Sequence, residues 1–88
     1  MTIARVSAVL MLAVAGAGPA AAQVSCYDLW YERNLVFAEN GYCFQTDLAQ
    51  RTFAEFECWT RNPALSTYEQ RRIDEIRDEE RRRGCNVN

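Results

Sequence analysis

Four cysteines limit what this chain can fold into more than any other feature. They are far apart, with 16, 14 and 26 residues between Cys26, Cys43, Cys58 and Cys85. Metal-binding cysteines usually come in close pairs, and the sequence has no histidine to complete such a site. An even number of widely spaced cysteines is typical of disulfides in an oxidising compartment. We therefore expect two disulfides and no metal ion.

The first 22 residues indicate such a compartment, because they are typical of a cleavable secretory signal peptide. A single charge, Arg5, precedes the apolar run 6–16 and the three alanines 20–22. A membrane-spanning helix needs about 20 apolar residues, and glycines and a proline interrupt this run earlier. We predict cleavage after Ala22, export to the periplasm or the medium, and no membrane insertion of the mature chain.

The remaining 66 of the 88 residues, 23–88, are expected to form one domain and a monomer. Nine arginines against twelve acidic residues give it a net charge of −3. A chain this short buries only about 60% of the surface that its unfolded form exposes, so it depends on disulfides. The basic run 81–83 lies beside as many acids, and a helix dipole explains cations in a last turn. We expect no nucleic-acid binding.

Capping residues and apolar spacing predict an all-α fold. Two long helices are expected, one from the capping residues 25–28 to Asn40, the other from the capping box 66–69 to Arg83. A short helix is expected from 47 to 53 or 54, and residues 56–64 form a packed connector. The fold class is thus a small three-helix domain braced by two disulfides.

The helix lengths restrict how the cysteines can pair. Cys26 and Cys43 flank the first helix and lie roughly 20 Å apart, too far for a disulfide. Pairing Cys58 with Cys85 would stretch a short connector along the whole third helix. Cys26 can then pair with Cys85 and Cys43 with Cys58, or Cys26 with Cys58 and Cys43 with Cys85. We favour the first pairing, because it allows the two long helices to pack antiparallel.

Arg33 lies in the middle of the apolar face of the first helix, where an unpaired guanidinium would be costly. If the long helices are antiparallel, Glu80 comes within reach of it. We predict an ion pair between Arg33 and Glu80, with Glu69 as the second choice and a backbone carbonyl as the remaining alternative.

The residues that catalysis usually needs are scarce. Histidine and lysine are both missing, which excludes Ser-His and Cys-His pairs and Schiff bases. The acids of the third helix alternate with arginines at helical spacing, as in Asp78 with Arg82 and Glu79 with Arg83, and this is typical of a solvated face. We assign no catalytic residue and no cofactor.

Aromatic side chains are numerous, and most of them are expected to form the core. Tyr27 and Tyr31 lie on the flank of the first helix and are instead candidates for docking a partner.

Residues 33–44, with the sequence RNLVFAENGYCF, resemble the signature of the YARHG domain, approximately R-N-x-I-Y-A-R-H-G-Y-x-F. Glu39 and Asn40 replace the Arg and His of that pattern, so the motif is interpreted as architectural. The resemblance implies a small exported bacterial domain of the cell envelope and no particular activity. The matching residues are Arg33, Asn34, Phe37, Gly41, Tyr42 and Phe44.

These observations favour a non-catalytic envelope interaction module that binds a protein or cell-wall component. The alternative is a small envelope hydrolase that uses carboxylates, or an inhibitor of such an enzyme. An enzyme would need two acids that converge in a cleft away from arginines.

The first prediction concerns processing. Protein purified from an exporting host should begin at Gln23 and have a mass four hydrogens below that of the fully reduced chain. Intact-mass measurement checks both points, allowing for loss of one ammonia if Gln23 cyclises. Free thiols in the denatured protein would contradict the two-disulfide assignment.

Overall fold

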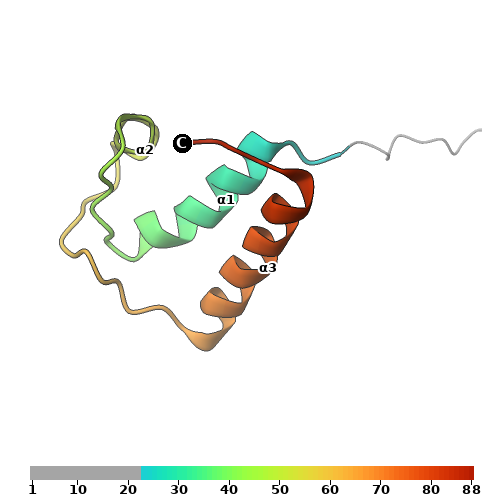
Figure 1. Ribbon diagram of the computed structural model, residues 1–88. Coiled ribbons are helices and arrows are strands. Elements are labelled where there is room, and N and C mark those ends of the chain that lie inside the picture. The colour runs from blue at the N-terminus through green and yellow to red at the C-terminus, as the bar shows by residue number, and fades with distance from the viewer. Residues whose placement is uncertain (1–22) are drawn as a thin grey trace, which may run out of the picture.

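The fold consists of three helices, and the computed structural model describes residues 23–88 (Figure 1). The helices are α1 (Cys26–Glu39), α2 (Asp47–Thr52) and α3 (Thr67–Arg83). No strand occurs in the described residues, so the predicted all-α fold of two long helices and one short helix is confirmed. The predicted signal peptide, residues 1–22, lies outside the described residues.

Capping side chains fix where the long helices begin. Ser25 Oγ accepts a hydrogen bond from the backbone N–H of Asp28 at 3.0 Å, and the carboxylate of Asp28 accepts one from the N–H of Ser25. Ser66 and Glu69 repeat this capping box at the start of α3. Both boxes satisfy amides that the helix itself leaves unpaired.

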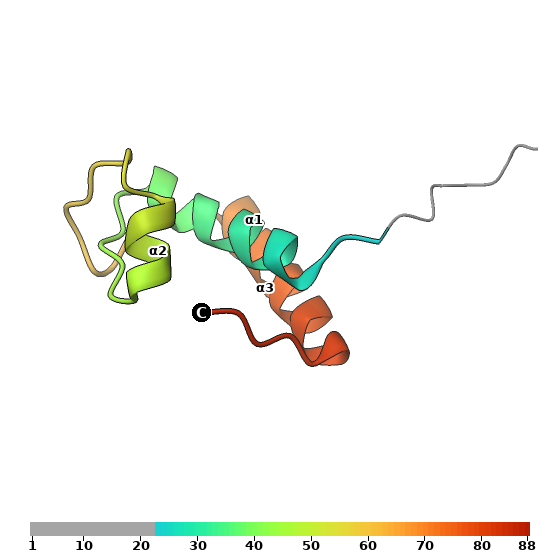
Figure 2. The ribbon, with the colours of Figure 1, turned by 90° about the horizontal axis from the view of Figure 1, so that it is seen from above.

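The long helices lie side by side in opposite directions (Figures 1 and 2). The Cys26–Cys85 disulfide joins the start of α1 to the residue just beyond α3, with the two Cα atoms 5.5 Å apart. At the opposite end, the side chain of Asn40 donates to Glu69 Oε2 at 3.2 Å. The antiparallel arrangement and the favoured disulfide pairing are therefore confirmed.

The helix α1 is buried on more than one side. Ile73 and Ile76 of α3 are 0% and 2% exposed, which confirms the thin apolar stripe of that helix. A second cluster consists of Trp30, Ala38, Ala49 and Phe53. Because α1 packs against α3 on one side and takes part in this cluster on the other, its buried positions extend around the helix. They include Asn34, which is 9% exposed.

The C-terminal tail completes the second cluster. After α3 the chain turns back past α1 toward α2 (Figure 1), and Val87 packs against the buried cluster. This contact adds the tail to the side of the core where α2 packs.

The second disulfide, Cys43–Cys58, ties the segment after α1 to the connector, with Cα atoms 4.9 Å apart. Backbone hydrogen bonds reinforce it: the N–H of Cys43 donates to Thr60 O at 2.9 Å, and the N–H of Trp59 donates to Gly41 O at 2.8 Å. The prediction of a packed connector is wrong for its aromatic residues, because Trp59 is 69% exposed and Phe56 39%. Backbone pairing and the disulfide hold this segment in place of side-chain burial.

Two glycines allow a prediction about packing in this region. Gly41 and Gly84 both have a positive φ, 84° and 67°, and alanine in that conformation costs roughly 1–2 kcal/mol. A Cβ atom on Gly41 would also lie 2.6 Å from Cδ2 of the Trp59 ring, whereas one on Gly84 would meet no atom within 4 Å. Chemical denaturation should therefore show a larger loss of stability for Gly41→Ala than for Gly84→Ala.

The double variant Gly41→Ala with Trp59→Ala separates the two causes. If the indole is removed, the stability loss caused by Gly41→Ala should shrink to about the size of the loss caused by Gly84→Ala. Equal losses for the two single glycine variants would show that the Trp59 contact contributes nothing.

Candidate functional site

The residues that match the family signature are first of all structural. Asn34 Nδ2 donates to Trp30 O at 2.9 Å, and the rings of Phe37, Tyr42 and Phe44 follow one another with centroids 5.6 and 5.0 Å apart. The ring contacts and the positive φ of Gly41 hold the turn that leaves α1, whereas the Asn34 bond lies within the helix.

Arg33 and Glu80 form the predicted link between α1 and α3. Arg33 Nε lies 2.8 Å from Glu80 Oε1, and Arg33 Nη2 lies 3.0 Å from Glu80 Oε2. The side chains are only 19% and 12% exposed, so this two-point contact is largely shielded from water. Glu69, the second choice, pairs with Asn40 instead.

The signature residues also line a cavity of about 440 Å³ between α1, the connector and α3. Arg33, Asn34, Phe37 and Tyr42 form one wall. The connector contributes Arg61, Asn62, Pro63 and Leu65, and α3 contributes Gln70 and Arg77. No acidic side chain is among these lining residues.

Two of the three cavity arginines form no ion pair within the part of the chain that the structure describes. Arg61 and Arg77 have no ion pair or side-chain hydrogen bond to any residue of 23–88, whereas Arg33 is bound to Glu80. The guanidinium carbon of Arg77 lies 6.0 Å from the centre of the Phe37 ring, close enough for a cation–π contact. The cavity therefore combines two guanidinium groups that form no ion pair within residues 23–88 with aromatic and apolar surface.

Sequence reasoning did not identify this cavity. It treated the arginines of the third helix as a solvated face and did not consider Arg61. The sequence signals were Arg61, beside the Asn-Pro step of the connector, and Arg77 on the third helix. Only the structure shows that the acids at positions 74 and 80 bond to Gln70 and Arg33.

The predicted docking residues lie on an exposed strip of aromatic rings. Tyr27 is 44% exposed and Tyr31 38%, and their ring centroids are 6.2 Å apart. Tyr31 contacts the buried Phe53 at 5.2 Å, and Phe53 contacts the exposed Phe56 at 6.1 Å. We call Tyr27, Tyr31 and Phe56 the aromatic strip.

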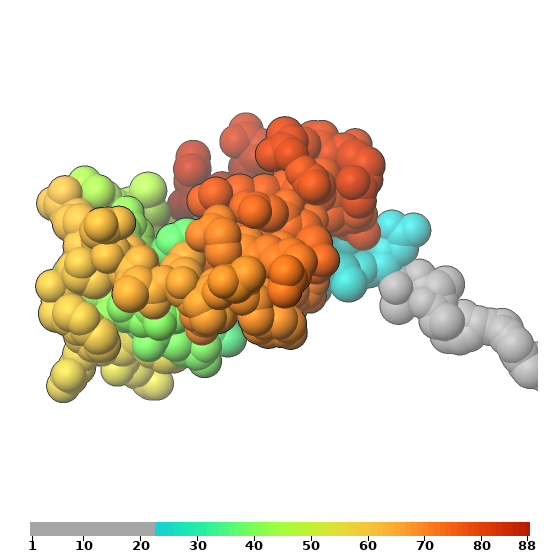
Figure 3. Space-filling model, turned by 90° about the horizontal axis from the view of Figure 1, so that it is seen from below, coloured from blue at the N-terminus to red at the C-terminus, as the bar shows by residue number. Residues whose placement is uncertain are grey.

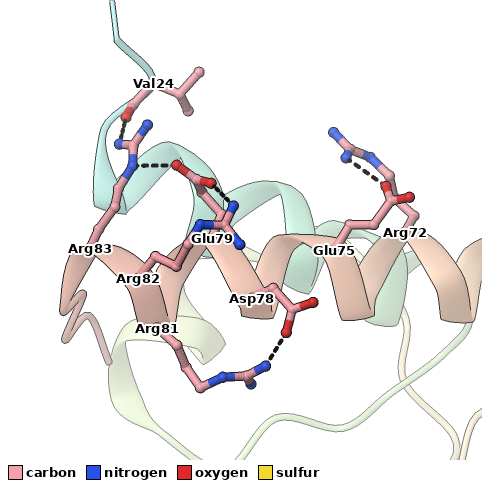
Figure 4. A network of polar contacts seen from close by, with 8 residues as sticks. All are labelled: Val24, Arg72, Glu75, Asp78, Glu79, Arg81, Arg82 and Arg83. Carbon is pink, nitrogen blue, oxygen red and sulfur yellow. Dashed lines mark hydrogen bonds and ion pairs between the residues drawn. The ribbon is translucent and has the colours of Figure 1, made fainter.

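The outer face of α3 is a network of paired charges (Figure 4). Glu79 accepts from Arg83 at 2.7 Å, as expected from the i,i+4 spacing, and also pairs with Arg82. The predicted pair of Asp78 with Arg82 is wrong: Asp78 binds Arg81, because Arg82 reaches Glu79 one turn away. Arg83 also donates to the backbone oxygen of Val24, next to the Cys26–Cys85 disulfide.

Hydrogen bonds shift the titration of three charged groups. The backbone N–H of Ser66 and, next, the side chain of Asn40 hold the pKa of Glu69 below its ordinary value. Arg83 and Arg82 lower the pKa of Glu79 in the same way. The hydrogen bond to Glu32 raises the pKa of Arg72, and this pair makes a more exposed link between α1 and α3.

The described residues contain no group of three or more His, Cys, Asp or Glu arranged to hold a metal ion. Among the helices of residues 23–88, none has the length and hydropathy to cross a membrane.

A family model matches this chain. The sequence model described as the YARHG domain matches residues 7–81, which is most of the chain and all three helices except the last two residues of α3. No curated protein matches significantly. The same holds for solved structures. The match ends before Cys85 and Val87, the two residues through which the tail is attached.

A double-mutant cycle measures the link between the long helices. Removing one partner of the shielded pair, in Arg33→Met or Glu80→Leu, should cost roughly 3 kcal/mol of unfolding free energy, because the other charge is left stranded. The double variant should lose clearly less than the sum of the two losses. The matched control is the exposed pair between the same helices, Arg72→Met with Glu32→Leu, whose coupling should stay below about 1 kcal/mol. Additive losses for Arg33 and Glu80 would contradict the assigned role.

The lowered pKa values of Glu69 and Glu79 predict acid sensitivity. A carboxylate whose folded pKa is below its unfolded pKa stabilises the fold above the unfolded value, and this stability is lost as the pH falls through the folded value. The melting temperature should therefore fall as the pH drops below about 4.3, the ordinary glutamate pKa. The drop should be smaller for Glu69→Gln. Glu57→Gln is the control, since Glu57 is exposed and forms no side-chain bond with any residue of 23–88. If the two variants gave the same curve of melting temperature against pH, the role assigned to Glu69 would be refuted.

Proposed function

This chain belongs to the YARHG family, and we propose that its mature domain is an exported, non-catalytic module that binds a protein or cell-wall component in the cell envelope. Export rests on the signal-peptide pattern of residues 1–22. The two disulfides, which are formed in oxidising compartments, agree with it.

The observation that carries the proposal is the composition of the cavity. Its polar groups are guanidinium groups, side-chain amides and the Tyr42 hydroxyl. Guanidinium groups stay protonated at all ordinary pH values and amides do not titrate, so these groups donate and accept hydrogen bonds without exchanging protons. Such a cavity has the means to hold a ligand. Among its lining side chains only the Tyr42 hydroxyl can exchange a proton, and no carboxylate, imidazole, amine or thiol is present to transform the ligand.

The carboxylates give no support to the hydrolase alternative. Glu80 is bound by Arg33 at two points, and Glu79 is bound by Arg82 and Arg83. Glu69 is engaged by the N-terminus of its helix and by Asn40. A general acid needs a raised pKa, whereas the pKa shifts of Glu69 and Glu79 are downward.

Saturable binding tests this function. The oxidised mature domain, carrying a fluorescent label, is titrated with isolated peptidoglycan sacculi and, separately, with purified envelope proteins, and unlabelled domain serves as competitor. We expect saturable binding to one of these that disappears when both disulfides are reduced and the thiols blocked. Binding to neither would overturn the proposal.

The same assay tests the aromatic strip. Tyr27→Ser with Tyr31→Ser should weaken binding if a partner docks on the strip, because aromatic rings contribute much of the energy of protein interfaces. Tyr68→Ser is the matched control, since Tyr68 is 70% exposed and lies outside the strip. Unchanged binding of the double tyrosine variant would show that the strip takes no part.

A further inference from the structure

The cavity lies where three segments meet. On the face of the molecule in Figure 3, α3 and the connector lie beside each other, with α1 visible between them. The cavity is formed by the same three segments, so the α1–α3 pairing and the Cys43–Cys58 disulfide both fix its walls. When the walls of a site are fixed before binding, the protein loses little conformational entropy as the ligand binds.

The charges of the cavity differ from those of the molecule. The mature domain has a net charge of −3, yet the cavity is lined by Arg33, Arg61 and Arg77 and by no acid. Glu80 compensates only Arg33. Asp74, one turn before Arg77, accepts a hydrogen bond from Gln70 at 3.1 Å. Arg61 and Arg77 therefore remain as donors for an anion, and guanidinium groups fit planar oxyanions well.

The other residues that line the cavity indicate the chemistry of the part of the ligand next to the anionic group. Phe37, Pro63 and Leu65 present apolar surface, while Asn62 and Gln70 present amides that can bind a peptide backbone. A volume of about 440 Å³ is at the small end of the range for ligand sites. This space suits a few residues of a peptide and excludes a large ligand.

We propose that this cavity binds the free carboxylate of a short peptide, with Arg61 and Arg77 holding the carboxylate and Phe37, Pro63 and Leu65 contacting the adjacent apolar side chain. The inference rests on the proposed function and names its ligand class. A small monoanion is favoured over a polyanion, because a nucleic acid or an anionic membrane would bring many further negative charges against a surface of net charge −3.

The test uses an acetylated Ala-Ala-Leu peptide with a free carboxylate as the probe, titrated into the oxidised, isotope-labelled mature protein. Chemical shifts of the side-chain amides of Asn62 and Gln70 and of arginine Nε–H groups report on the cavity. We expect saturable shifts at these signals and binding at least about tenfold weaker for the same peptide with an amidated C-terminus, since a charged acceptor forms the stronger hydrogen bonds. Equal binding of the amidated peptide would overturn the inference without any protein variant.

A pair of double variants locates the site. Arg61→Gln with Arg77→Gln should weaken the free peptide by about tenfold or more. Arg51→Gln with Arg71→Gln removes the same charge from exposed arginines outside the cavity, and it should bind as the parent does. Equal losses for the two double variants would mean that only net charge matters, and this would overturn the inference. Far-ultraviolet circular dichroism verifies that both double variants keep their helices.

Inorganic phosphate is the comparison ligand. If phosphate shifts the same signals and binds more tightly than the peptide, the cavity is a general anion site and the peptide inference fails. If no probe binds in the cavity but sacculi or an envelope protein still bind the domain, the inference fails and the proposed function stands. Loss of all binding would overturn both.

Discussion

The pairing of α1 with α3 is the constraint on which the rest of the fold depends. Only Ile73 and Ile76 of α3 are fully buried, so apolar contact alone gives this helix of 17 residues little attachment. Polar and covalent links compensate: the Cys26–Cys85 disulfide, the Arg33–Glu80 pair, the Asn40–Glu69 hydrogen bond and the more exposed Arg72–Glu32 pair. A helix that is polar on most of its surface is thereby held in one position.

This pairing also determines the two surfaces available for binding. The cavity needs α3 beside α1, because Arg77 of α3 and Phe37 of α1 both line it and contact each other. The aromatic strip needs the other side of α1, where Phe53 packs between Tyr31 and Phe56. Since the C-terminal tail continues from Cys85 to Val87 and covers the core next to α2, the disulfide at the end of α3 supports both surfaces.

Helical spacing in the sequence allowed the disulfide pairing and the ion pair between the long helices to be predicted. The contacts of the loops could not be predicted in this way. Helix length excluded one cysteine pairing, and helical projection placed Arg33 opposite Glu80. The exposed position of Trp59 follows instead from the backbone hydrogen bonds of residues 41 and 43 with residues 59 and 60, and this pairing has no periodic signal in the sequence. The packing of Val87 and the cavity of Arg61 and Arg77 depend on where irregular segments return in space. Asp78 pairs with Arg81 and not with Arg82, because several arginines compete for few acids on the outer face of α3.

Amide hydrogen exchange in two disulfide variants tests this account most directly. Cys26→Ser with Cys85→Ser removes the link at the end of α3, whereas Cys43→Ser with Cys58→Ser removes the link of the connector and leaves the helix pair joined. We predict that the first variant loses protection of the α3 amides while α1 amides near Trp30 keep theirs, and that the second variant keeps protection in both long helices. Protection of α3 that survives the first change, or is lost equally in the second, would contradict the central place of the α1–α3 pairing.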